Sequence, residues 1–345
     1  MKNKPTVIDL FCGCGGLSYG FIEAGYDVLL GIDHWKDAIV TFENTHKNAK
    51  GIVADLFVET PKDISKKTGI KDIDIIIGGP PCQGFSIAGK RIIDDERNQL
   101  YKSFVNFVDF YKPKVFLMEN VPNIVSMGKG VVKESIIEDF KKLGYTVVYK
   151  VLLASEFGVP QNRRRAFFVG TKNKKEFIFP EPTTKNPISS KEAISDLSEK
   201  SLIDGTKYIT EPKSDYQKLI RGKSNFIYNH EITNHSEQTT SIISLVPDGG
   251  NYKDLPEELR KTRNVNIAWT RLNSKKPSFT IDTGHRHHFH YKYNRVPTVR
   301  ESARIQSFPD SFIFLGSKTS QYKQVGNAVP PILAQIIATE IKKYL

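Results

Sequence analysis

The chain has 345 residues, of which 39% are hydrophobic and 26% charged, a balance typical of a soluble globular protein with room for two domains. No apolar stretch approaches the roughly 20 residues of a membrane span, and MKNKPTVIDL contains no signal-peptide core, so we expect a cytoplasmic protein. Three cysteines, Cys12, Cys14 and Cys82, form no CxxC pair, which argues against a disulfide framework and a structural metal site.

The first half of the chain alternates short apolar runs with amphipathic segments. Because strands that alternate with helices form parallel sheets, this pattern predicts a parallel sheet covered on both faces, with ligands bound beyond the carboxyl ends of the strands. The predicted strands are residues 6–11, 28–33, 74–79, 114–120, 146–158 and 165–171, and the predicted helices include 17–25, 37–46 and 99–111.

The composition changes at about Pro180, after which Lys, Ser, Thr, Pro and Asn dominate and the periodicity weakens until about Pro297. Helical patterns return in VRESARIQSF and in residues 330–345. We therefore predict one domain of residues 1–180, a second of 181–296, and a C-terminal segment of 297–345 that returns to the first domain.

Most of the net charge of +12 lies in the second half, because residues 1–150 sum to about +1 and leave about +11 for residues 151–345. Between Arg260 and Arg300, ten positions are Lys or Arg and the only acidic residue is Asp282. Aromatic residues and histidines are interleaved with them. A basic stretch is usually a solvated surface, but this density favours a nucleic-acid partner.

Glycines and aspartates follow the first strands. DLFCGCGGLSYGF places Gly13, Gly15 and Gly16 where a ligand could approach bare backbone at a helix amino terminus. Asp33, at the end of the second strand, is spaced to accept hydrogen bonds from ribose hydroxyls, and Asp55 could receive an adenine amino group. Either aspartate could instead cap a helix. Three such sites at successive strand ends favour a nucleoside-bearing cofactor.

Cys82 stands in GGPPCQGFS, a loop that follows an apolar strand. A thiol is nucleophilic as the thiolate, and backbone amides at a strand end favour that anion. Pro80 and Pro81 restrict the backbone and so help to fix the direction of the sulfur. We therefore interpret Cys82 as a nucleophile and not as an inert buried cysteine.

Three further polar residues complete the predicted catalytic set. Glu119, in ENV, ends the strand expected beside that of Cys82, and a glutamic acid there could donate a proton or hydrogen bond to a heterocycle. QNRRR adds Arg163 and Arg165, which strand alternation would place on one face. A plain solvated arginine run remains open for these two. The set is consistent with a nucleobase as the substrate.

Together these motifs resemble the cytosine carbon-5 DNA methyltransferases of the bacterial restriction-modification type. DLFCGCGG, GGPPCQGFS, ENV, QNRRR, RESARIQSFPD and QVGNAVPP occur in the order of that family and span nearly the whole chain outside residues 181–296. The resemblance implies an α/β, Rossmann-like S-adenosylmethionine-dependent methyltransferase fold with a mostly parallel sheet and a smaller target recognition domain. It also implies a cofactor site made of Phe11, Gly13, Gly15, Gly16, Asp33, Asp55, Pro80, Leu100, Asn327 and Val329. The residue after Asp33 is His34, followed by Trp35, and either ring could face the adenine.

The family's chemistry gives each catalytic residue a role. The Cys82 thiolate would add to carbon 6 of cytosine, with Glu119 at nitrogen 3 and Arg165 at the exocyclic oxygen, and the resulting enamine would attack the methyl sulfonium. The base must be flipped out of the duplex, and residues 87–99 resemble the family's mobile loop that closes over it. Residues 181–296 would read the target through major-groove contacts. The predicted DNA-binding residues are Arg271, Lys275, Lys276, Arg286 and His288, with Arg286 the first choice as base reader.

Other functions fit the motifs less well. A transfer-RNA cytosine methyltransferase shares most of them, but that branch carries a Cys-Phe-Thr tripeptide and no cysteine follows Cys82 here. A non-catalytic DNA-binding regulator would not need Cys82, Glu119 and Arg165, and a nicotinamide oxidoreductase would not need PPCQ. We expect a nucleoid-associated monomer whose partner is double-stranded DNA. The sequence leaves open which site it methylates and whether a restriction endonuclease acts on the same site.

Overall fold

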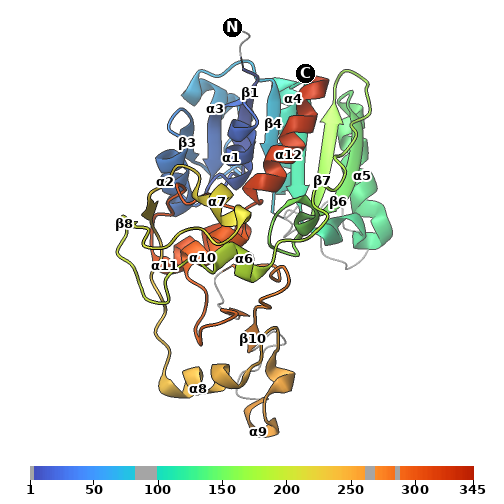
Figure 1. Cartoon of the computed structure of the whole chain (residues 1–345). Coiled ribbons are helices and arrows are strands. Elements are labelled where there is room, and N and C mark those ends of the chain that lie inside the picture. The colour runs from blue at the N-terminus through green and yellow to red at the C-terminus, as the bar shows by residue number, and fades with distance from the viewer. Residues whose placement is uncertain (1–3, 82–98, 261–268, 284–287) are drawn as a thin grey trace. The chain divides into compact units, whose positions relative to one another are not determined.

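The computed structural model describes residues 4–81, 99–260, 269–283 and 288–345 (Figure 1). The chain divides into two compact units, which we call the sheet unit and the second unit. The sheet unit comprises Met1–Leu153, Arg164–Glu181 and Leu333–Leu345, and the second unit comprises Ala154–Arg163 and Pro182–Ile332. None of the helices in the described ranges is long and apolar enough to cross a membrane.

A seven-stranded sheet forms the centre of the sheet unit, in the order β3-β2-β1-β4-β5-β7-β6 (Figure 1). Only β7 runs in the direction opposite to the other six strands. The strands are β1 (Thr6–Leu10), β2 (Asp27–Asp33), β3 (Lys50–Val53), β4 (Ile75–Gly78), β5 (Val115–Asn120), β6 (Thr146–Leu153) and β7 (Arg164–Thr171). The prediction of a mostly parallel sheet in an α/β fold is confirmed.

Helices and short 3-10 turns connect these strands, and their apolar faces pack on the sheet. In the aromatic core, Phe116 of β5 stacks on Phe140 at 4.0 Å between ring centroids, and Phe104 meets both rings edge-on. The helices are α1 (Gly16–Glu23), α2 (Lys36–Thr45), α3 (Pro61–Thr68), α4 (Gln99–Tyr111), α5 (Val131–Lys142) and α12 (Pro331–Ile341). The 3-10 turns are η2 (Pro122–Val125), η3 (Met127–Gly130) and η6 (Lys342–Tyr344). This packing holds the strand ends in fixed positions.

The predicted strand of residues 146–158 is too long. Strand β6 ends at Leu153, and a 3-10 turn, η4 (Ala154–Phe157), follows it. The apolar character continues through this turn because Ala154 and Phe157 are buried, so hydrophobicity alone could not show where the strand ends. Strand β3 was not predicted at all. It lies at the edge of the sheet with no buried residue, and therefore lacks the apolar run that identified the others.

The second unit is built from short elements around two small apolar cores. One core includes Tyr216, Ile220 and Ile305, and the other includes Ile243, Trp269 and Phe289. Its helices are α6 (Ser190–Ile194), α7 (Asp215–Arg221), α8 (Glu237–Leu245), α9 (Glu257–Arg260), α10 (Val299–Ile305) and α11 (Lys318–Asn327), with one 3-10 turn, η5 (Tyr252–Asp254). The strands β8 (Thr206–Lys207) and β9 (Phe226–Ile227) pair antiparallel, and β10 (Thr270–Arg271) and β11 (His288–Phe289) pair parallel.

Such short elements explain why the periodicity weakens after Pro180, because a helix of one or two turns repeats too few times to produce a pattern. Buried ion pairs supplement the apolar cores. The Arg304 guanidinium donates to Asp196 and Asp310, and Arg295 donates to both oxygens of Glu301. The predicted boundaries at residues 180 and 296 came from changes in composition and periodicity, and the assignment of target recognition to residues 181–296 stays a prediction.

Candidate active site

An ion pair lies at the carboxyl end of β5. Arg165 Nε is 2.8 Å from Glu119 Oε1, and the two side chains are only 16% and 13% exposed. The antiparallel pairing of β5 with β7 brings them together, because Glu119 lies opposite Phe167, two residues along β7 from Arg165. A partly buried guanidinium–carboxylate pair fixes the direction of both groups. The structure thus brings together two of the predicted catalytic residues.

The end of β4 lies directly beside this pair. A methyl group added at Gly79 would stand 2.8 Å from Glu119 Oε2, so the absence of a side chain leaves room for that carboxylate oxygen. The carbonyl of the next residue, Pro80, accepts a hydrogen bond from Asn120 Nδ2 at 2.9 Å. Cys82, the predicted nucleophile, comes two residues later and lies outside the described residues. As predicted, β4 and β5 are neighbours in the sheet, so their carboxyl ends lie side by side.

Arg163 differs from Arg165. Strand β7 begins at Arg164, so the alternation that would place both side chains on one face of a strand does not apply to Arg163. Arg163 belongs to the second unit, is 1% exposed, and donates from Nη2 to the carbonyl of Gly326 at 2.8 Å. In the structure, Arg163 therefore supports the fold of the QVGNAVPP segment.

The glycine turn after β1 is joined to the end of β2 by Asp33. The Asp33 carboxylate accepts hydrogen bonds from the backbone N–H groups of Gly13 and Trp35, each at 2.9 Å. Gly13 has a φ of 54°, and a side chain there would meet nothing within 4 Å, so open space adjoins this backbone. Asp33 does not cap α2, whose amino-cap residue is Trp35. A carboxylate can accept about four hydrogen bonds, so Asp33 keeps capacity for ribose hydroxyls.

Two buried side chains beside this turn were not predicted. The ring of His46 packs on Gly15, where an added Cβ would lie 2.3 Å from His46 Cε1, and burial lowers the pKa of His46 to about 4. Asp9 in β1 is 1% exposed and accepts a hydrogen bond from Ser18 Oγ at 2.6 Å. Burial raises the pKa of Asp9 to about 7. The sequence feature that could have revealed Asp9 is its position as a lone carboxylate within the apolar run TVIDLF.

The other predicted cofactor residues fall into two groups. Phe11, with a φ of 57°, and Gly16, the first residue of α1, belong to the same turn, and His34 Nδ1 lies 3.3 Å from Asp33 Oδ1 with its side chain 78% exposed. Asp55 is exposed and accepts from Phe57 N–H at 2.9 Å, as a local turn would require. Pro80, Leu100, Asn327 and Val329 also lie among the described residues, Pro80 and Leu100 in the sheet unit and Asn327 and Val329 in the second unit.

Arg271 has a structural role in place of the predicted DNA contact. The residue is 4% exposed, and all five of its N–H groups donate within the second unit. The acceptors are the carbonyls of Val246, Ile243, His290 and Tyr293 and the side chain of Asn294. An arginine with five donors used in this way has none left for a phosphate.

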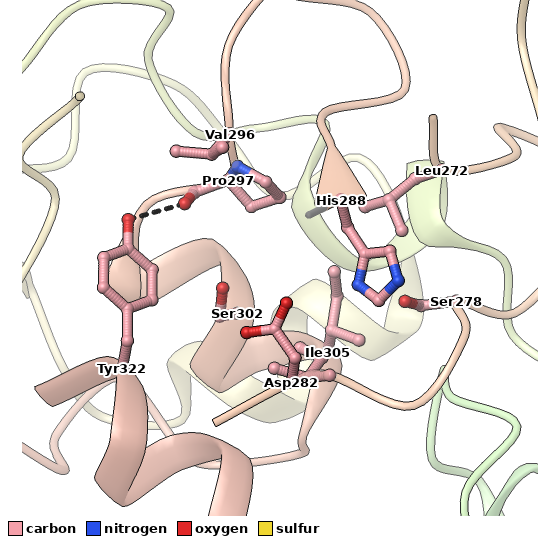
Figure 2. Close-up of a pocket in the computed structure, with 10 residues that line it drawn as sticks. Leu272, Ser278, Asp282, His288, Val296, Pro297, Ser302, Ile305 and Tyr322 are labelled. Atoms are coloured by element: carbon pink, nitrogen blue, oxygen red, sulfur yellow. Dashed lines mark hydrogen bonds between the residues drawn. The ribbon is translucent and has the colours of Figure 1, made fainter. Parts of the chain in front are cut away.

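Of the other predicted DNA-binding residues, Lys275 and Lys276 are exposed, and Arg286 lies outside the described residues. His288 lines a small pocket of the second unit, where its ring lies near Ser278 (Figure 2). The same ring stacks on Phe279 with centroids 5.7 Å apart. His288 is therefore half-buried in this pocket, beside the exposed ring of Phe279.

Comparison with known proteins gives a consistent result. A model of the C-5 cytosine-specific DNA methylase family matches residues 5–343. Type II methyltransferase M1.HphI of Haemophilus parahaemolyticus is 40% identical over 341 residues, covering 98% of this chain and 87% of that protein. Type II methyltransferase M.DdeI of Desulfomicrobium norvegicum is 40% identical over an alignment of 372 residues, covering 98% and 89%.

Solved structures agree with this assignment. The crystal structure of an E. coli prophage-encoded protein, described as a DNA modification methyltransferase, superposes with a TM-score of 0.82 at 28% identity and covers 99% of both chains. S. pombe Dnmt2 methyltransferase, at 17% identity and a TM-score of 0.61, shares the fold. The chain belongs to the C-5 cytosine-specific DNA methylase family and is a DNA (cytosine-5) methyltransferase.

Proposed function

We propose that the protein transfers a methyl group from S-adenosylmethionine to carbon 5 of a flipped cytosine within a specific short double-stranded DNA sequence, through a covalent adduct with Cys82. The observation that carries this proposal is the Glu119–Arg165 pair. It lies beside the end of β4, from which the chain runs through Pro80 and Pro81 directly into Cys82.

The strand ends of β1 and β2 fit a nucleoside-bearing cofactor. Asp33 retains capacity for ribose hydroxyls, and the open space at Gly13 would let a ligand reach bare backbone. Phe11, Gly15, Gly16 and His34 would complete this part of the site, with Asp55, Pro80, Leu100, Asn327 and Val329 assigned to it from the motifs. When bound, S-adenosylmethionine supplies an electrophilic methyl group on a sulfonium.

The protein's own residues would activate the base. Carbon 5 of cytosine is a weak nucleophile, and addition of the Cys82 thiolate to carbon 6 makes a carbon–sulfur bond and turns the ring into an enamine. Glu119 would support this electron shift at nitrogen 3, and Arg165 at the exocyclic oxygen. After carbon 5 has received the methyl group, loss of its proton and breakage of the carbon–sulfur bond return the thiolate. Target carbons of a duplex are accessible only when the base is flipped out.

The second half of the chain would bind the DNA. Residues 181–296 would read the target, with Lys275 and Lys276 at phosphates and Arg286 and His288 nearer the bases. Two relatives that are 40% identical over nearly the whole chain are named type II methyltransferases, which supports a role in a restriction-modification system. We propose a monomeric enzyme that acts at the nucleoid, with a restriction endonuclease directed at the same site.

The test uses purified full-length protein and plasmid DNA. Bisulfite sequencing after incubation with S-adenosylmethionine should show one cytosine protected in one short sequence. A duplex with 5-fluorocytosine at that position should trap the native protein covalently, because no proton can leave carbon 5. Cys82→Ser should bind the cofactor but form no adduct, since a hydroxyl is far less ionised than a thiol at neutral pH. Methyl transfer at the native rate by Cys82→Ser would refute the mechanism.

A further inference from the structure

We infer that Asn120 is a positioning residue, whose carboxamide fixes the point from which the chain leaves β4 toward the nucleophile. The inference rests on the proposed function of Cys82. Asn120 is the last residue of β5 and is 6% exposed. It lies next to Glu119 in sequence but points its amide at the neighbouring strand.

The register of β4 and β5 leads to this assignment. The two strands pair in parallel, with Ile77 opposite Leu117 and Gly78 opposite Met118, and the ladder stops there. Continued by one and two residues, the same register sets Gly79 against Glu119 and Pro80 against Asn120. The contacts follow this extension, because Glu119 Oε2 lies over Gly79 and Asn120 Nδ2 donates to the carbonyl of Pro80.

A proline ends the backbone ladder at this point. Pro80 has no N–H, so it cannot take part in the ladder as a donor. The Asn120 carboxamide stands between the two chains instead. Its Oδ1 accepts from the backbone N–H of Val121 at 2.8 Å, and its Nδ2 donates to the carbonyl of Pro80 at 2.9 Å. The Asn120 side chain thereby satisfies both the N–H group of Val121, just after β5, and the carbonyl of Pro80, just after β4.

Asparagine suits this bridge because it combines an acceptor and a donor at the same short reach. Aspartate has the same shape and would still accept from Val121 N–H, but its ionised form has no proton for the Pro80 carbonyl. The backbone of Asn120 is also held on its other side, where it pairs with Ala166 of β7. Movement of the carboxamide would therefore shift the Pro80 carbonyl and not the β5–β7 pairing that carries Glu119 and Arg165.

The test compares Asn120→Asp and Asn120→Ala with the native protein. The measured quantity is the single-turnover rate of covalent adduct formation on duplex DNA containing 5-fluorocytosine. We expect both variants to be roughly tenfold to a hundredfold slower, as for loss of a hydrogen bond to a buried group. Cofactor affinity by calorimetry should stay native. The ratio of the Asn120→Asp rate to the native rate should rise as the pH is lowered from 8 to 5.5, because a protonated aspartate can donate, whereas the Asn120→Ala ratio should stay constant.

Asn123→Asp is the matched control, because Asn123 is exposed in η2 and the substitution is the same. It should form adduct at the native rate. Circular dichroism at the assay temperature shows whether each variant is folded. If Asn120→Asp does not fold, the adduct rate of Asn120→Ala alone tests the inference. Native adduct rates in a folded Asn120 variant would overturn the inference while leaving the function intact. If the native protein forms no adduct, the proposed function fails and this inference fails with it.

Discussion

Asp9 should make the protein less stable as the pH rises through neutrality. Its carboxyl is 1% exposed at the end of β1, and burial raises its pKa from 3.8 to about 7, against the opposing hydrogen bond from Ser18. The side chain is thus protonated in the folded protein at mildly acidic pH, when the same group in the unfolded chain is already ionised. The unfolded chain therefore binds fewer protons between about pH 4 and 7, and stability falls across that interval.

The magnitude follows from the shift. About three pKa units at 1.36 kcal/mol each correspond to about 4 kcal/mol of stability, present below about pH 4 and lost by about pH 7. Asp9→Asn cannot ionise and still offers Ser18 an acceptor. We therefore expect it to match the native protein near pH 4 within about 1 kcal/mol and to be more stable by up to about 4 kcal/mol at pH 8.

Urea unfolding at pH 4, 6 and 8 measures this difference. Asp72→Asn is the control, because Asp72 is an exposed aspartate of the same unit, and its pH profile should follow that of the native protein. Ser18→Ala should extend the loss of stability to higher pH, since it removes the hydrogen bond that opposes the raised pKa of Asp9. Parallel pH profiles for the native protein and Asp9→Asn would refute the reasoning, because they would mean that Asp9 titrates alike in the folded and unfolded chains.

Three further changes test other parts of the structure. Asp33→Ala should weaken S-adenosylmethionine binding in calorimetry by about 1.5 to 3 kcal/mol, and native affinity would leave Asp33 only its turn-forming role. Arg271→Lys, with three donors for five acceptors, should lower the urea-derived stability by about 1 to 3 kcal/mol, and an unchanged midpoint would contradict its structural role. Lys276→Ala should weaken DNA binding on all sequences alike and lower the log–log salt slope by roughly one, and an unchanged slope would exclude a phosphate contact.

The sequence predicted those parts of the fold that are buried on both sides. Strands β1, β4 and β5 are almost wholly buried, so each appears as a largely apolar run, which Asp9 interrupts in β1 and which ends in a glycine or polar residue in β4 and β5. The edge strand β3 has no such run. Asp33 and the glycine turn could also be predicted, because the features that make them suitable for a ligand, a strand-end carboxylate and bare backbone, are local.

Long-range contacts could not be predicted. Arg163 lies just before β7 and forms a hydrogen bond with the carbonyl of Gly326, 163 positions away, a contact that the local motif QNRRR does not indicate. Arg271 looks like any arginine of a basic segment, because nothing near it in sequence shows that carbonyls from α8 and from residues 290–293 converge on it. Asn120 was part of a recognised motif, but its role depends on Pro80, which lies 40 residues earlier.

The buried arginines also change the meaning of the basic second half. Among the described residues of the second unit, six arginines are less than 9% exposed, whereas the buried acidic residues there are Asp196, Glu301 and Asp310. The six are Arg163, Arg221, Arg271, Arg295, Arg300 and Arg304. Part of the formal positive charge is therefore buried and holds the unit together. The exposed basic residues that remain are mostly lysines, which bind phosphates as mobile point charges and do not read bases by bidentate hydrogen bonds. Electrostatic attraction to DNA and recognition of the target sequence should accordingly depend on different residues.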